Sequence, residues 1–173
     1  MAIEIRYETV VNRCKLLSSY EAQASADKAG DTLYMSIKMT EKENGFIIAH
    51  LKEASRMIES RLNSSLDLTI DTDDGITEGV GGITAMTIAD MESVNNKGKI
   101  IVSVSEDYDM DMKLTRRGSF AKSLAETMVA WIMGQWLMEK VQQRGEAYMR
   151  MYEQMLDATR VIALKRDRPT YKA

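Results

Sequence analysis

An apolar run at residues 128–138 constrains the fold more than any other segment of this chain of 173 residues. Its sequence, MVAWIMGQWLM, contains one clearly polar residue, Gln135. The run is too short to cross a bilayer, because a membrane-spanning helix needs about 20 apolar residues. We therefore predict a buried helix. A helix that is apolar on nearly all sides must be covered on several of them, either as the centre of a helical bundle or partly by another subunit.

Apolar residues at helical spacing predict four helices, at about 7–26, 40–63, 118 or 119 to 143, and 146–165. The second has the clearest start, a capping box at Thr40-Glu-Lys-Glu43. A break at Gln143-Arg144-Gly145 makes the last two helices an antiparallel hairpin. The expected inner face of the fourth helix carries Tyr148, Met151, Tyr152, Met155, Thr159 and Ile162.

Between residues 66 and 112 the apolar spacing changes from helical to alternating, which is typical of β-strands. We expect strands at 66–71, 83–91 and 99–105, and a further one if the alternation at 108–112 is a strand. The expected fold is mainly α with a β insertion, that is α+β: an antiparallel bundle of about four helices carrying a small antiparallel sheet or hairpin. Its parts are a helical core at 1–65, an acidic β-rich insertion at 66–112, a helical hairpin at 113–166 and a basic C-terminal arm at 167–173.

The chain has one cysteine and one histidine, which excludes several classes of site. A disulfide framework is impossible, and a Cys/His zinc site needs about four ligands. Cys14 and His50 lie on apolar faces of the expected helices, where a structural role is the simpler interpretation. The sequence has no phosphate-binding glycine loop and no GxSxG or HExxH motif. We expect no enzymatic activity and no cofactor.

The net charge of −3 is unevenly distributed. Residues 67–111 contain eleven acids and two lysines, whereas residues 160–173 contain five basic side chains and one aspartate. Two contact surfaces of opposite sign are one interpretation, and a solvated face with a soluble tail is the other. The segment Asp71-Thr-Asp73-Asp74-Gly75 departs from a calcium loop, because its glycine comes one position early and Gly82 stands at the twelfth position. We expect no metal site.

Three groups of residues are candidates for contacts with other molecules. The helical hairpin contributes possible interface anchors, which are Trp131, Met133, Trp136, Tyr148 and Tyr152. Pro169 ends the helical pattern and begins an extended basic arm. The arm carries Arg166, Arg168, Pro169, Tyr171 and Lys172. An acidic surface, facing a channel or a neighbour, would carry Asp71, Asp73, Asp74, Asp107, Asp109 and Asp111.

The two ends of the expected helical core resemble the neck proteins of tailed bacteriophages, the head–tail connector or adaptor family. Residues 40–63, from the capping box through Ile47-Ile-Ala-His-Leu-Lys-Glu-Ala-Ser-Arg56, look like the N-terminal helix pair of such adaptors. Residues 133–165 are similar to their closing long helix, where the stretch Ala147-Tyr-Met-Arg-Met-Tyr-Glu153 leads to the basic tail with Arg168-Pro169. The likeness in pattern covers roughly two-thirds of the chain. The middle segment, 66–112, is longer and more β-rich than a minimal adaptor loop.

The resemblance implies a structural protein of the virion neck, made in the host cytoplasm and not bound to a membrane. It implies a ring, typically of twelve copies, between the portal protein and a further neck or tail protein. The basic arm would reach onto the portal, and an acidic channel surface would let DNA pass without specific binding, because like charges repel the phosphates. The alternative is a small intracellular oligomeric binding module or regulator that uses a Met-rich helical surface.

Overall fold

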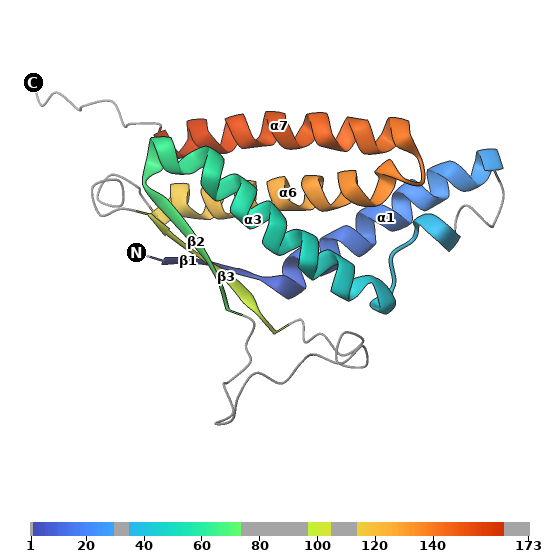
Figure 1. Cartoon of the computed structure of the whole chain (residues 1–173), viewed down its shortest axis with the longest axis horizontal. Helices are drawn as coiled ribbons and strands as arrows, with labels where there is room; N and C mark the ends of the chain where they lie inside the picture. Colours follow the sequence, from blue (N-terminus) through green and yellow to red (C-terminus); the bar gives the residue numbers. More distant parts are fainter. Residues whose placement is uncertain (1, 30–34, 74–96, 105–113, 165–173) are drawn as a thin grey trace, which may run out of the picture.

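The computed structural model describes residues 2–29, 35–73, 97–104 and 114–164 (Figure 1). In these residues, long helices pack against one face of a three-stranded antiparallel sheet, which confirms the expected α+β class. The elements in chain order are β1 (Ala2–Arg6), α1 (Tyr7–Ala29), η1 (Glu41–Glu43), α3 (Asn44–Leu66), β2 (Leu68–Asp73), β3 (Lys99–Val104), α6 (Leu114–Met138) and α7 (Gln142–Leu164). The expected strands at 83–91 and 108–112 lie outside the described residues.

The sheet joins the N-terminus of the chain to its middle, with the strand order β1-β3-β2. In the register, Ile5 of β1 lies opposite Ile100 of β3, and Leu68 of β2 lies opposite Val104. Alternate residues of β3 are buried, so one face of the sheet covers the helices and the other faces outwards. Strands β2 and β3 confirm the strands predicted near 66–71 and at 99–105. Strand β1 was not predicted, because residues 1–65 were expected to form a helical core.

The start of the second predicted helix is confirmed, and its end is corrected. The capping box is formed: the Thr40 side chain accepts from a backbone N–H, and the Glu43 side chain accepts the Thr40 N–H. A single 3-10 turn, η1, precedes α3. The helix continues to Leu66, where a strand was predicted to begin. Asp67 ends it with a left-handed φ of 45° and donates its N–H to the Asn63 carbonyl at 3.1 Å.

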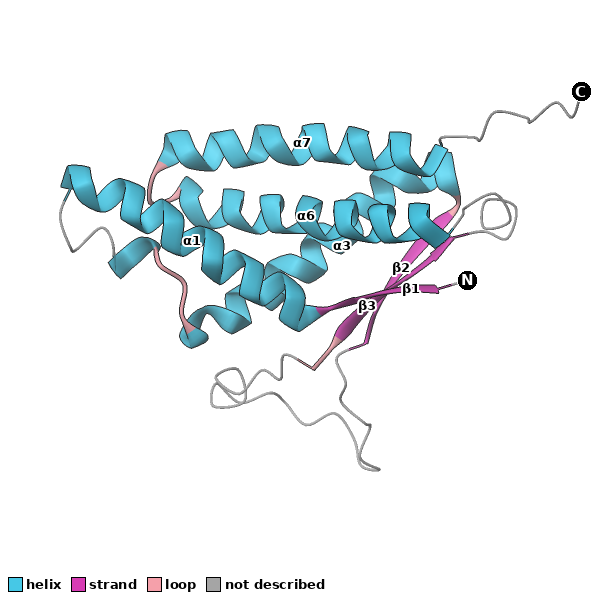
Figure 2. Cartoon of the chain, turned by 180° about the vertical axis from the view of Figure 1, so that it is seen from behind, coloured by secondary structure: helices cyan, strands magenta, loops and turns pink. Residues whose placement is uncertain are grey.

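Helix α6 contains the apolar run and is the centre of the structure. It packs against α1, α3, α7 and β1, and Figure 2 shows α7 along one side of it and α1 along the other. Met128, Ile132 and Met133 have no exposed surface. The chain therefore covers this apolar helix with its own elements, which include a strand as well as helices.

The turn between α6 and α7 differs from the prediction. Helix α6 ends at Met138, and α7 begins at Gln142, so the predicted break at 143–145 is wrong. Gly145 lies buried inside α7. A Cβ atom at Gly145 would be 2.6 Å from the Met138 backbone nitrogen. The glycine therefore allows the close approach of the two helices and does not end one of them.

Candidate functional site

Three of the predicted interface anchors lie in the core of this chain. Trp131 is 9% exposed, Tyr152 2% and Met133 0%. The rings of Trp131 and Tyr152 meet edge to face, with 5.1 Å between their centroids. The side chains of α6 and α7 thus already cover each other, which corrects the assignment of these three residues as anchors for another subunit.

The other two predicted anchors are half-buried and connect elements of the same chain. The Trp136 indole donates to the Ile37 carbonyl at 2.6 Å, and the Lys140 ammonium lies 3.5 Å from its ring centroid. The Tyr148 hydroxyl donates to Glu21 of α1 at 3.2 Å. Burial, followed by the nearby Glu21 carboxylate, raises the pKa of Tyr148 to about 12. Both side chains hold the helices together.

A cluster of hydroxyl groups lies between α6 and α7. The hydroxyls of Ser123 and Thr159 are 2.6 Å apart, and Thr159 also donates to the Met155 carbonyl at 2.7 Å. Thr127 donates to the Ser123 carbonyl at 2.7 Å. Because these hydroxyls are hydrogen-bonded to one another and to backbone carbonyls, the cluster satisfies buried polar groups and fixes the helix pair.

The described part of the acidic surface is the outer face of the sheet. Asp71 and Asp73 are exposed there, and Asp73 lies opposite Lys99 in the register. The Lys99 ammonium lies 2.7 Å from a Glu4 carboxylate oxygen, and this hydrogen bond raises the pKa of Lys99. Lys99 therefore offsets part of the negative charge of the acidic side chains on this face. Asp74, Asp107, Asp109 and Asp111 lie outside the described residues, as do Arg166, Arg168, Pro169, Tyr171 and Lys172 of the arm.

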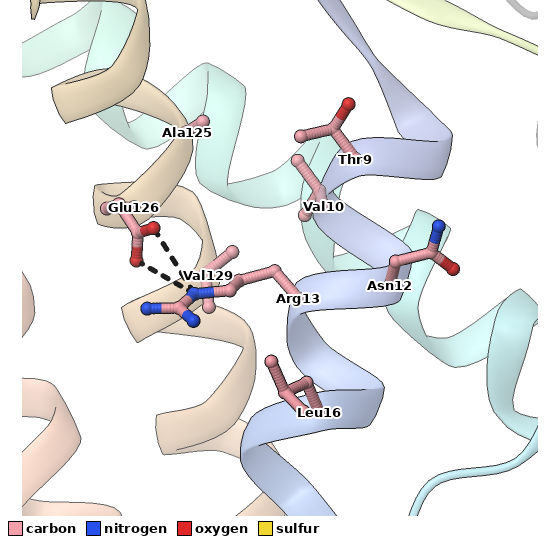
Figure 3. Close-up of a pocket in the computed structure, with 8 residues that line it drawn as sticks. All are labelled: Thr9, Val10, Asn12, Arg13, Leu16, Ala125, Glu126 and Val129. Atoms are coloured by element: carbon pink, nitrogen blue, oxygen red, sulfur yellow. Dashed lines mark hydrogen bonds and ion pairs between the residues drawn. The ribbon is translucent and has the colours of Figure 1, made fainter.

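Two adjoining cavities, of about 240 and 450 Å³, form a groove between the start of α1, β1 and α6. Both are lined by Thr9, Ala125 and Glu126. Figure 3 shows Arg13 reaching across the smaller one, where its Nε atom lies 3.2 Å from a Glu126 carboxylate oxygen. The sequence alone did not predict this groove. Its signal is the pair of short side chains at Ala121 and Ala125, which are four residues apart on α6 and leave space beside α1.

Exposed apolar side chains are concentrated on two helices on either side of α6. On α1, Leu16 is 44% and Tyr20 58% exposed. On α7, Met151 is 41%, Val161 64% and Leu164 41% exposed. Met151, which the sequence placed on the inner face, therefore lies outside. Three further exposed methionines lie elsewhere on the surface, which are Met35, Met57 and Met138.

The described residues thus offer surfaces for binding other molecules. Within the described ranges, no three His, Cys, Asp or Glu side chains are grouped to hold a metal ion. None of the helices described is long and apolar enough to span a membrane. No protein-family model, no curated protein and no solved structure matches this chain.

Proposed function

We propose that this chain is a structural virion protein, a subunit of the head–tail connector or adaptor ring in the neck of a tailed bacteriophage. The observation that carries the proposal is the presence of exposed apolar side chains on both α1 and α7, on different sides of α6. A ring is closed by heterologous contacts, in which each subunit uses two different surfaces. The outer face of α7 in one copy would pack beside α1 and its groove in the next.

Three further features support a neck protein. The helices would form the antiparallel bundle of about four helices that the sequence predicts, with the sheet at one end. Asp71 and Asp73 on the outer sheet face belong to a segment of strongly negative charge, which would face the channel or a neighbouring copy and let DNA pass. The basic residues at 166–172 would form the arm that binds the portal protein.

The mass of the assembly tests this proposal. The full chain is mixed with the portal protein encoded in the same genome, and the mass is measured by light scattering. We expect a ring well beyond a tetramer, about twelve times the subunit mass of 19.5 kDa, bound to the portal. A strict monomer or dimer of this chain, with and without the portal, would contradict the proposal.

Deletion of residues 166–173 tests the arm separately. The variant should bind the portal more weakly and should unfold at the same urea concentration as the full chain, because the arm lies beyond the last helix. Equal portal binding by the variant and the full chain would show that residues 166–173 do not bind the portal protein.

The alternative function, a small intracellular oligomeric binding module or regulator, is favoured by one observation. Among the described residues, four of the exposed large apolar side chains are methionines, namely Met35, Met57, Met138 and Met151. Flexible methionine side chains adapt to different partners. This alternative predicts a small oligomer that stays small when the portal protein is present, and the same mass measurement distinguishes the two functions.

A further inference from the structure

The outward side of α7 carries a stripe of residues that nothing in the described chain covers. The stripe consists of Ala147, Met151, Gln154, Ala158 and Val161. All five are exposed, and they are spaced four, three, four and three residues apart. This is the spacing of the contact positions in a coiled coil. The buried Tyr152 and Leu156 point in another direction, into the core of the chain. We call these five residues the outer stripe.

Two opposite charges border the outer stripe on one side. Arg150 directly precedes Met151, and Asp157 directly precedes Ala158, so both occupy the same flanking position of the seven-residue repeat. Both side chains are exposed, and among the described residues neither forms an ion pair. Charged side chains at such flanking positions select the partner and the orientation of paired helices.

We propose that the outer stripe binds the outer stripe of a second copy of this chain, with the two α7 helices antiparallel about a two-fold axis. The register that we propose brings residues of one outer stripe opposite residues of the other. Ala147 then lies opposite Ala158 of the second copy, and Met151 lies opposite its Gln154. Arg150 then faces Asp157 of the second copy. The two-fold axis repeats every contact, so both charges of both copies are paired.

The observations favour a second copy over an unrelated partner because the surface is complementary to itself. In a parallel pair the flanking charges of one helix would face the side of the other that carries Tyr148 and Met155, so they would remain unpaired. The two alanines let the helix backbones approach closely. The stripe extends over about 21 Å, at 1.5 Å per residue, so the contact is small and the dimer should form in the micromolar range.

The inference does not rest on the proposed ring, because the pair forms in the free chain. The ring would use the same face of α7 against α1 of the next copy, so the two contacts exclude each other and ring assembly would separate the pair. The experiment is sedimentation velocity of the full chain, without portal protein, over about a hundredfold range of concentration. We expect a monomer that becomes a dimer as concentration rises. A monomer at every concentration would overturn the inference and would leave the ring proposal to its own test.

Charge reversal then tests the register. R150E and D157K should each weaken the dimer about tenfold or more, because each places two pairs of like charges in contact. The double variant R150E/D157K should restore it. An equimolar mixture of the two single variants should form a mixed dimer, since the two reversed charges face each other and the two native charges face each other.

R160E is the matched control, because it makes the same charge change at an exposed position of α7 outside the outer stripe. It should leave the dimer unchanged, and circular dichroism should show the same helix content for all variants. A dimer that R160E weakens as much as R150E does, or that the double variant fails to restore, would overturn the proposed register.

Discussion

Helices α6 and α7 form one hairpin, but they differ in how the chain covers them. Between residues 127 and 134 every side of α6 is buried, because α1, α3, α7 and β1 all pack against it. Helix α7 is buried on one side, and its outer stripe is exposed. The more apolar helix is thus the core of the chain, and the less apolar one offers the free surface. Apolar residues on all sides indicate burial, whereas a second apolar stripe on an amphipathic helix indicates a partner.

The largest expected difference in the free energy of unfolding is between a substitution in α6 and one in α7. Trp131→Ala removes one of the two tryptophans of the apolar run and its contact with Tyr152, and should lower the free energy of unfolding by about 3 to 5 kcal/mol. Met151→Ala, on the outer stripe, should change it by less than about 0.5 kcal/mol. Urea denaturation at low protein concentration measures both. Equal losses would contradict the contrast between the two helices.

Two glycines give the next contrast. Gly145→Ala places a Cβ 2.6 Å from the Met138 nitrogen and should cost about 2 to 3 kcal/mol of stability, because backbone must move. Gly118→Ala, in α6, meets nothing within 4 Å and should stabilise the chain by about 0.5 to 1 kcal/mol. Thermal unfolding followed by circular dichroism compares them. A harmless alanine at position 145 would show that the helices do not approach as described.

The hydroxyl cluster between α6 and α7 should contribute less to the free energy of unfolding. Thr159→Val keeps the shape of the side chain and removes the hydroxyl that lies 2.6 Å from that of Ser123, so we expect a loss of about 1 to 2 kcal/mol. Adding Ser123→Ala should cost less than the sum of the two single changes, because the two hydroxyls share one interaction. Additive losses in urea denaturation would show that they are independent.

The smallest expected effect is a decline in the free energy of unfolding at alkaline pH. The pKa of Tyr148 is raised from 10.0 to about 12 in the folded chain, so the unfolded chain loses this proton first. The stabilisation is complete below pH 10 and disappears as the pH rises towards 12. Tyr148→Phe should therefore reduce the decline in unfolding free energy over this range. The raised pKa of Tyr152 remains, so some decline should persist. An unchanged decline would contradict the burial of the Tyr148 hydroxyl.

Much of the helical structure could be predicted because helical spacing is a local signal. The first helix, the capping box at Thr40 and the last helix were placed within a few residues. The turn after Met138 could not be predicted, because residues 139–141 contain neither glycine nor proline. Gly145 looked like the break, whereas its role depends on how closely two helices approach, which no local pattern shows.

The contacts between distant segments could not be predicted. Ile3 and Ile5 alternate with Glu4 and Arg6, but five residues are a weak strand signal, and the partner strand β3 lies more than ninety residues away. Without β1, the number of elements that cover α6 was unknown, so Trp131 was assigned to an interface. The exposed position of Met151 likewise depends on which side of α7 faces α6.

A disulfide cross-link tests most directly whether the outer stripe of α7 is the surface that binds a second copy. Ala147→Cys and Ala158→Cys chains are mixed in equal amounts and oxidised, and the native Cys14 is buried. The antiparallel register predicts rapid cross-linking in the mixture and little in either variant alone, because positions 147 and 158 face each other only between copies. No cross-link in the mixture, or equal cross-linking of Ala147→Cys alone, would contradict the account.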